Sequence, residues 1–125
     1  GKSMGRNLLI VDDSASMRQV LSIALRGAGY EVVEASDGRD ALTKLDGRKF
    51  NLIVSDVNMP NLDGISFVKA AKALPAYKFT PIIMLTTESD KDKILAGKEA
   101  GVRAWIVKPF QPAVLLDAVS KLVLS

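Results

Sequence analysis

The stretch LLIVDD, residues 8–13, joins four apolar residues directly to two adjacent carboxylates, Asp12 and Asp13. A similar phrase, LIVSD, ends at Asp56. Short apolar runs without polar alternation are typical of strands in a parallel sheet that is covered on both faces. The two phrases therefore predict two buried parallel strands, each of which ends in acid.

Runs of this kind recur along the chain and predict further strands. Each is four to six residues long and rich in Val, Ile or Leu, and four of the five lack polar alternation. The predicted strands are NLLIVD (7–12), EVVEA (31–35), NLIVSD (51–56), PIIMLT (81–86) and AWIVK (104–108).

The segments between the strands have the apolar spacing of amphipathic helices. Gly27 and Gly29 are expected to end the first helix, Asp37 to cap the second and Pro112 to lie near the first turn of the last; a third helix is expected after Asn61. The residues expected to face the sheet are Met17, Val20, Leu21, Ala24 and Leu25 in the first helix, Ala41, Leu42 and Leu45 in the second, Phe67, Val68 and Ala71 in the third, and Val114, Leu115, Ala118, Val119 and Leu122 in the last.

The fourth helix, expected at about 90–100, has the weakest pattern. Its apolar face is little more than Ile94 and Leu95, and Gly97 in its interior costs about 1 kcal/mol relative to Ala. We therefore expect a loosely held helix.

The alternation of strands and helices predicts a single doubly wound α/β domain, a five-stranded parallel sheet with five helices on both faces. A chain of 125 residues is long enough for one domain with a substantial core. Gly1-Lys2-Ser3, which precede Met4, are interpreted as a remnant of cloning, so the domain is expected to span 4–125.

The composition excludes several classes of function. There is no Cys for a disulfide or thiolate site, and no His for the commonest general base. The formal net charge of +3 is too small and too dispersed to indicate nucleic-acid binding. No apolar run approaches the roughly 20 residues of a membrane span, and no signal peptide is recognisable, so a cytoplasmic protein without membrane contact is expected.

Polar side chains meet at one predicted edge of the sheet. Asp12 and Asp13 follow the first strand, Asp56 ends the third, Thr86 the fourth and Lys108 the fifth. Ligands of such sheets bind at the carboxyl ends of the strands. Any one of these residues alone would be interpreted as a cap, a strand residue or a solvated charge, but their coincidence at four strand ends predicts one shared pocket.

Electrostatic repulsion makes this acidic pocket costly without a cation. Two like charges about 4 Å apart repel by roughly 4 kcal/mol at an effective dielectric constant of 20. Lys108 offsets one charge, and the remaining oxygen ligands suit a hard divalent ion, Mg²⁺ above all.

Four motifs resemble those of one family. They are VDDS (11–14), SDVNMPNLDG (55–64), LTTES (85–89) and VKPF (107–110). With them the chain resembles the receiver domains of bacterial two-component response regulators, most closely the single-domain chemotaxis type, described as CheY-like, over 4–125. The resemblance implies a flavodoxin-like fold with the strand order 2-1-3-4-5.

The resemblance also implies the roles of the site residues. Asp56 would be phosphorylated by a sensor histidine kinase of the CheA-like type. Asp13, Asp56, the backbone carbonyl of Asn58 and, through water, Asp12 would hold Mg²⁺. Thr86 and Lys108 would contact the phosphoryl group, which suits a reaction that depends on positioning and charge stabilisation. The protein would be a signalling receiver that catalyses only its own phosphorylation and dephosphorylation.

Two loops complete the site. Met59-Pro60 and Asp63-Gly64 predict a turn after Asp56, in which Pro60 fixes φ and Gly64 can adopt a positive one. In the family the peptide corresponding to Lys108-Pro109 is cis, which would aim the lysine inward.

The resemblance places the output on the fourth helix, fifth strand and fifth helix, where Trp105 takes the position of an aromatic switch residue that is usually Tyr in chemotaxis relatives. The alternative is that Trp105 only covers the sheet edge. Asn58 and Glu88 match the polar pair of regulators that dephosphorylate fast, which predicts a short-lived phosphorylated state. A monomer that binds a downstream target, such as a flagellar motor switch, and a phosphatase is expected.

Other functions fit the sequence less well. A phosphatase of the haloacid-dehalogenase type would have DxDx[TV] at the first strand and a cap domain, whereas this chain has DDSAS. An FMN site would need a phosphate loop rich in Ser, Thr and Gly after that strand. A receiver that has lost phosphotransfer is disfavoured because all five site residues are present. Within the family, a phosphorelay receiver or the receiver of a longer regulator remain open.

Overall fold

The computed structural model describes residues 5–87 and 91–125. A parallel sheet runs through its middle, with the strand order β2-β1-β3-β4-β5. This confirms the predicted fold and order. The strands are β1 (Asn7–Val11), β2 (Glu31–Ala35), β3 (Leu52–Asp56), β4 (Ile82–Thr86) and β5 (Ala104–Val107).

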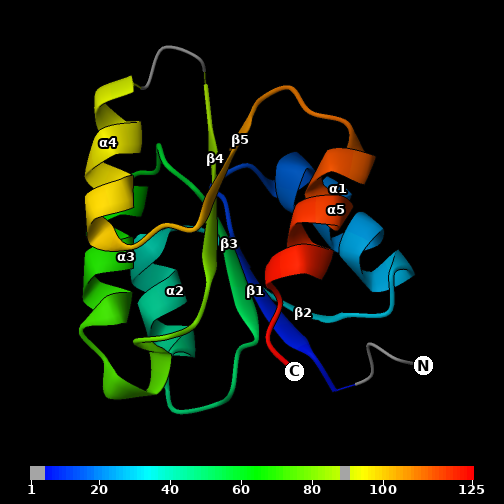
Figure 1. Ribbon diagram of the computed structural model, residues 1–125, viewed down its shortest axis with the longest axis horizontal. Helices are drawn as coiled ribbons and strands as arrows, with labels where there is room; N and C mark the ends of the chain where they lie inside the picture. Colours follow the sequence, from blue (N-terminus) through cyan, green and yellow to red (C-terminus); the bar gives the residue numbers. More distant parts are fainter. Residues whose placement is uncertain (1–4, 88–90) are drawn as a thin grey trace.

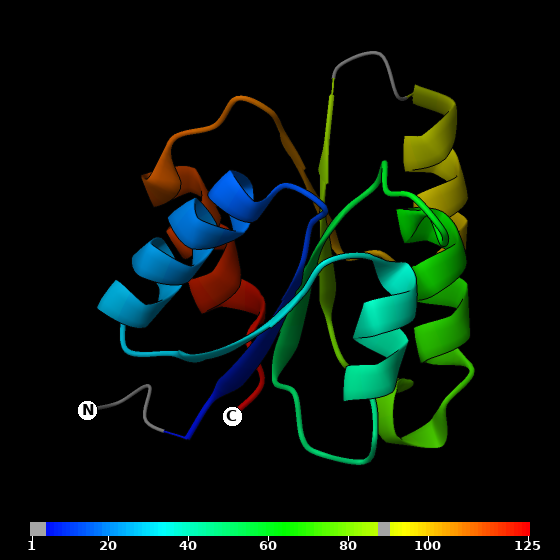
Figure 2. The same cartoon turned by 180° about the vertical axis from the view of Figure 1, so that it is seen from behind.

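Helices cover both faces of the sheet. Figure 1 shows α1 and α5 on one side and α2, α3 and α4 on the other, and the view from behind in Figure 2 agrees. The bounds are α1 (Ala15–Gly27), α2 (Gly38–Lys44), α3 (Gly64–Lys72), the short 3-10 helix η1 (Pro75–Tyr77), α4 (Lys91–Ala100) and α5 (Pro112–Leu122).

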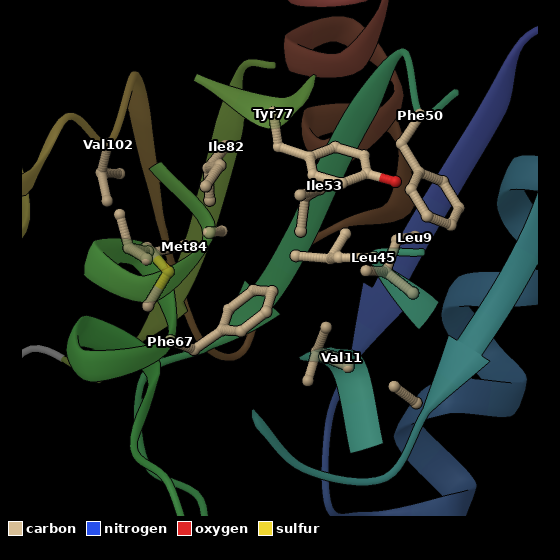
Figure 3. Packing of buried hydrophobic residues seen from close by; sticks show 14 of the residues in the cluster. Leu9, Val11, Leu45, Phe50, Ile53, Phe67, Tyr77, Ile82, Met84 and Val102 are labelled. Carbon is tan, nitrogen blue, oxygen red and sulfur yellow. The ribbon is translucent and has the colours of Figure 1, made fainter. Parts of the chain in front are cut away.

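The core forms two layers because successive strand residues point to opposite faces. Leu9 and Val11 pack under α2 and α3, whereas Leu8 and Ile10 pack under α1 and α5. Figure 3 shows the first layer, in which aromatic rings fill the space between strands and helices. Both sides of the central strands are therefore apolar, as their unbroken apolar runs predict.

Helix ends are fixed by the expected residues. The side chain of Asp37 accepts a hydrogen bond from the backbone N–H of Asp40 at the start of α2. After α1, Gly29 has φ 96° and donates to the carbonyl of Arg26. Both predictions are confirmed.

Three predicted core positions are wrong. Val20 on α1, Leu95 on α4 and Val114 on α5 are 49%, 60% and 51% exposed. A helix on a sheet buries a narrower stripe than the spacing of its apolar residues suggests, so the margins of the stripe remain in solvent. The central residues of the stripes, such as Leu21, Leu25, Leu115 and Val119, are fully buried.

Candidate functional site

Strand pairing brings the predicted site residues to one edge. Val11 pairs with Ser55, and Asp56 pairs with Leu85, so Asp12 follows β1 beside the end of β3. Thr86 ends β4, and its carbonyl accepts a hydrogen bond from the backbone N–H of Lys108 at 2.7 Å. The residues at these four strand ends are therefore neighbours along the carboxyl edge of the sheet.

Three carboxylates gather at this edge. Asp12, Asp13 and Asp56 each offer an oxygen, and these oxygens all lie within 4.8 Å of one another. Asp12 is 1% and Asp56 is 6% exposed, whereas Asp13 is exposed to solvent. The predicted acidic cluster is thus formed, with one side open to water.

Lys108 supplies a positive charge to the cluster. Its Nζ lies 3.2 Å from Oδ1 of Asp56 and 3.6 Å from Oδ2 of Asp12. The peptide between Lys108 and Pro109 is cis, as expected from the resemblance.

One lysine does not neutralise the site. Burial raises the pKa of Asp56 above its ordinary value, the Lys108 ammonium opposes this shift, and the neighbouring Asp12 adds to it. The net direction is upward, so the surroundings disfavour the ionised carboxylate. A second cation at this position would relieve that cost.

The donors present fit a hard divalent cation. Oδ2 of Asp12 is buried and accepts no hydrogen bond in the part of the chain that the structure describes. A buried carboxylate oxygen without such a partner is costly. Mg²⁺ is usually bound through one or two carboxylates and keeps several waters, and the exposed Asp13 leaves one side of the cluster open to water. The residues at this edge therefore fit Mg²⁺.

Thr86 and Asn58 also lie at this edge but make other contacts. Thr86 is 1% exposed, and its hydroxyl donates to the carbonyl of Thr87 at 3.2 Å. The side-chain oxygen of Asn58 accepts a hydrogen bond from Nζ of Lys93 on α4. Glu88, the partner predicted for Asn58 in fast dephosphorylation, lies outside the described residues.

The loop after β3 corrects one prediction. Gly64 is the first residue of α3 and does not have a positive φ; Asn61 does, at 68°. Gly64 is required for a different reason, because a Cβ there would lie 2.4 Å from the carbonyl oxygen of Asp56 and 2.5 Å from Cε of Met84. The absence of a side chain lets α3 begin directly against the site.

Two residues at the site were missed from the sequence. Arg18 on α1 donates to the carbonyl of Asp12 at 2.6 Å, and its Nε lies 3.5 Å from Oε1 of Glu34. Lys93 reaches Asn58 from α4. Arg18 is the fourth residue of α1, one turn after the N-cap Ser14, and a long basic side chain so close to the end of β1 was a signal that it could reach Asp12.

Trp105 lies on β5, partly exposed, beside α4. Its Nε1 is buried and has no hydrogen-bond partner among the described residues. Gly97 is the buried residue of α4, and a Cβ there would lie 2.1 Å from Cζ2 of the indole. Gly97, which appeared from the sequence only as a weakness of the helix, makes room for Trp105.

Comparison with known protein families identifies one match. The family described as "Response regulator receiver domain" matches residues 8–120. The chain is 38% identical over 116 residues to the chemotaxis protein CheY of Pseudomonas aeruginosa, covering 92% of this chain and 94% of that protein. It is 44% identical over 112 residues to chemotaxis protein CheY1 of Helicobacter pylori, covering 88% of this chain and 90% of the relative.

Solved structures share the fold. The chemotaxis protein CheY4 of Vibrio cholerae is 49% identical, with a TM-score of 0.89 over 94% of this chain and 98% of that chain. The receiver domain of sensor histidine kinase PA1611 of Pseudomonas aeruginosa is 28% identical, with a TM-score of 0.86 over 94% of this chain and 97% of that chain. The latter structure has a magnesium ion coordinated in its active site cleft.

Proposed function

The chain belongs to the response regulator receiver domain family, and we propose that Asp56 is the residue by which it accepts a phosphoryl group in two-component signalling. The observation that carries this assignment is the position of Asp56 at the end of β3, with Lys108 Nζ at 3.2 Å and the oxygens of Asp12 and Asp13 within 4.8 Å. Among the residues that the structure describes, Asp12 is also nearly buried, but its Oδ2 lies farther from Lys108 Nζ, at 3.6 Å.

The transfer reaction follows from these positions. One carboxylate oxygen of Asp56 forms the new bond to phosphorus while the bond from phosphorus to the donor, a phosphohistidine of the kinase, breaks. The Lys108 ammonium balances negative charge on the phosphoryl oxygens. The hydroxyl of Thr86 would have to turn from the carbonyl of Thr87, its present acceptor, to donate to the phosphoryl group.

The acidic cluster is proposed as the place where Mg²⁺ binds. Asp13, Asp56 and the backbone carbonyl of Asn58 would hold the ion, and Asp12 would act through water. When bound, Mg²⁺ would neutralise charge on the carboxylates and the phosphoryl oxygens. Arg18, through its bond to the Asp12 carbonyl, holds the backbone of Asp12 in place.

The pathway is proposed to be chemotaxis, because named chemotaxis proteins cover about nine tenths of the chain at 38% and 44% identity. The donor would then be a CheA-like histidine kinase, and the protein would work in the cytoplasm as a monomer. The output surface is proposed on α4, β5 and α5, where Leu95 and Val107 are 60% and 39% exposed. A flagellar motor switch is the target we would test first, and a phosphatase is a further candidate partner.

Intact mass spectrometry with acetyl phosphate as donor tests the function. We expect one added phosphoryl group in the presence of Mg²⁺, none after Mg²⁺ is chelated, and none in Asp56→Asn. Trp105 fluorescence, recorded in parallel, should change with phosphorylation if Trp105 takes part in the switch. Absence of the mass increase with every donor would leave a receiver that only binds other proteins.

The same sample tests two further points. The phosphorylated protein should lose its group quickly in Mg²⁺, and a label that persists for many hours would contradict fast dephosphorylation. Turnover of small phosphate esters would instead indicate a phosphatase.

A further inference from the structure

A pocket of about 360 Å³ lies on the other end of the sheet from the acidic site. It forms where the carboxyl end of α3, the segment entering β4 and the loop between α4 and β5 meet. These segments lie on the α3 and α4 side of the sheet in Figure 1. The residues that line it are Lys72, Lys78, Phe79, Pro81, Ala100, Gly101 and Arg103.

The pocket carries an excess of positive charge. Lys72, Lys78 and Arg103 converge on it, and no carboxylate among the described residues forms a salt bridge with any of them. Partial burial and the nearby Arg103 lower the pKa of Lys72. The ammonium of Lys72 and the guanidinium of Arg103 therefore repel each other, and an anion placed between these two groups would be attracted by both.

These cations have hydrogen-bond donors to spare. Lys72 Nζ donates to the backbone carbonyl of Thr80, which fixes the side chain at the pocket. An ammonium has three protons, so two remain for an incoming acceptor. The guanidinium of Arg103 adds a planar fork that suits a carboxylate.

An exposed aromatic ring stands beside the charges. Phe79 is 80% exposed, the largest value among the exposed large hydrophobic residues that the structure describes. Nζ of Lys78 lies 5.5 Å from its ring centre. Aromatic side chains and Arg are the residues most enriched in protein interfaces, and they contribute much of the binding energy there.

The exposure of the pocket to solvent favours a protein partner over a small-molecule ligand. Small-molecule sites bury most of their ligand, whereas Phe79 beside this pocket is 80% exposed. We propose that this pocket docks an acidic segment of a partner protein, with a carboxylate between Lys72 and Arg103 and an apolar side chain against Phe79. The proposal is independent of phosphotransfer, because Asp56 and Lys108 lie at the carboxyl end of the sheet and the pocket lies at the other end.

The probe is the peptide EDLEDL, acetylated at its N-terminus and amidated at its C-terminus. It is titrated into ¹⁵N-labelled protein, and the backbone amide signals are followed by NMR. Saturable shifts are expected at the backbone amides of Phe79, Gly101 and Arg103. The uncharged peptide QNLQNL is the matched control and should produce none. Asp56→Asn should bind EDLEDL as the unmodified protein does.

Two double variants show which surface lysines and arginines contribute to the binding of EDLEDL. Lys72→Gln combined with Arg103→Gln should weaken binding by about tenfold or more, since both charge pairs are lost. Lys49→Gln combined with Lys121→Gln removes the same charge elsewhere and should change the affinity by less than about twofold. The amide spectrum of each variant reports whether it is folded.

Four results would overturn the proposal. The first two are the absence of saturable shifts with EDLEDL and equal binding of QNLQNL. The third is a set of shifts confined to the α4 lysines at 91, 93 and 98. The fourth comes from a parallel titration with adenosine monophosphate, if this nucleotide saturates the pocket and EDLEDL does not. The last result would reassign the pocket to a nucleotide.

Discussion

Gly64 shows how closely single residues constrain the phosphoacceptor site. The backbone of Asp56 and the side chain of Met84 occupy the volume that a Cβ at Gly64 would take, at 2.4 Å and 2.5 Å. The carbonyl of Asp56 is fixed by β3 and cannot move away without disturbing the carboxylate. The start of α3 and the geometry of Asp56 are therefore linked through one missing methyl group.

Gly64→Ala is expected to destabilise the protein by about 1–3 kcal/mol, the usual cost of overpacking. The measurement is the free energy of unfolding in urea. Gly27→Ala is the matched control, because no atom lies within 4 Å of a Cβ there and Ala favours the helix by up to about 1 kcal/mol. Equal effects of the two substitutions would show that the close approach at Gly64 does not matter.

Asp63, the N-cap of α3, gives a pH-dependent contribution to stability. Partial burial pushes its pKa up, but hydrogen bonds from the backbone N–H and the hydroxyl of Ser66, each 2.9 Å, outweigh burial and the pKa is lowered. A lowered pKa in the folded state means that the ionised cap stabilises the fold above the ordinary carboxyl pKa and loses this effect as the pH falls through the lowered value.

Asp63→Ala should therefore cost about 1 kcal/mol of unfolding free energy at neutral pH, and its difference from the unmodified protein should shrink in acid. Urea unfolding at several pH values measures this. Asp63→Asn keeps a neutral cap and should show little of the pH dependence. A difference for Asp63→Ala that grows in acid would contradict the direction of the pKa shift.

At the scale of the elements, α4 comes close to Trp105 of β5 at Gly97. Its only buried residue is Gly97, which faces the indole of Trp105. Ala would be the better helix residue, so the sequence alone suggests a defect. In the fold, Gly97 and Trp105 are complementary in size.

Gly97→Ala is predicted to destabilise the protein by about 1–3 kcal/mol, because the indole must move. In a Trp105→Leu background the same change should cost less or be stabilising, since the helix gains propensity and only the flexible end of Ile65, 3.2 Å from the added Cβ, must shift. Circular dichroism during urea unfolding of the four proteins gives the coupling energy, expected at about 1 kcal/mol or more. A coupling near zero would show that Trp105 is not what excludes a side chain from position 97.

The elements differ in how well the sequence predicts them. The strands follow from unbroken apolar runs such as LLIV (8–11) and LIV (52–54) because both of their faces are buried, and the acids that follow them meet because parallel strands share a carboxyl edge. Helix faces were less certain: Val20 and Val114 have the right spacing but lie at the margin of the contact. Contacts that depend on tertiary placement, such as Gly64 against Asp56 or Lys93 against Asn58, leave no local pattern.

Across the whole molecule, the two ends of the sheet have opposite character. The carboxyl edge gathers Asp12, Asp13 and Asp56, and the other end gathers the cations around Phe79. That other end is also where the last residues are tied to the sheet. Asn51 is 2% exposed, its Oδ1 accepts from the backbone N–H of Asn7 at 2.9 Å, and its Nδ2 donates to the carbonyls of Leu124 and Ser125 at 3.1 Å and 3.2 Å.

Asn51→Ala should lower the free energy of unfolding by about 1–3 kcal/mol, because buried polar groups lose their partners. Lys49→Ala is the control: it removes an exposed bond to the carbonyl of Ser125 and should change stability by less than about 0.5 kcal/mol. The amide of Asn7 should also exchange faster in Asn51→Ala. Unchanged exchange at Asn7 would mean that Asn51 does not hold β1 as described.

The most direct test of the central claim is to locate the phosphoryl group on the chain. Borohydride reduces an acyl phosphate to an alcohol, so the phosphorylated aspartate becomes homoserine and survives digestion for mass spectrometry. After treatment with acetyl phosphate and Mg²⁺, homoserine is predicted at position 56 and nowhere else. Homoserine at position 12 or 13, or its absence from a protein that has gained a phosphoryl group, would contradict the assignment of Asp56.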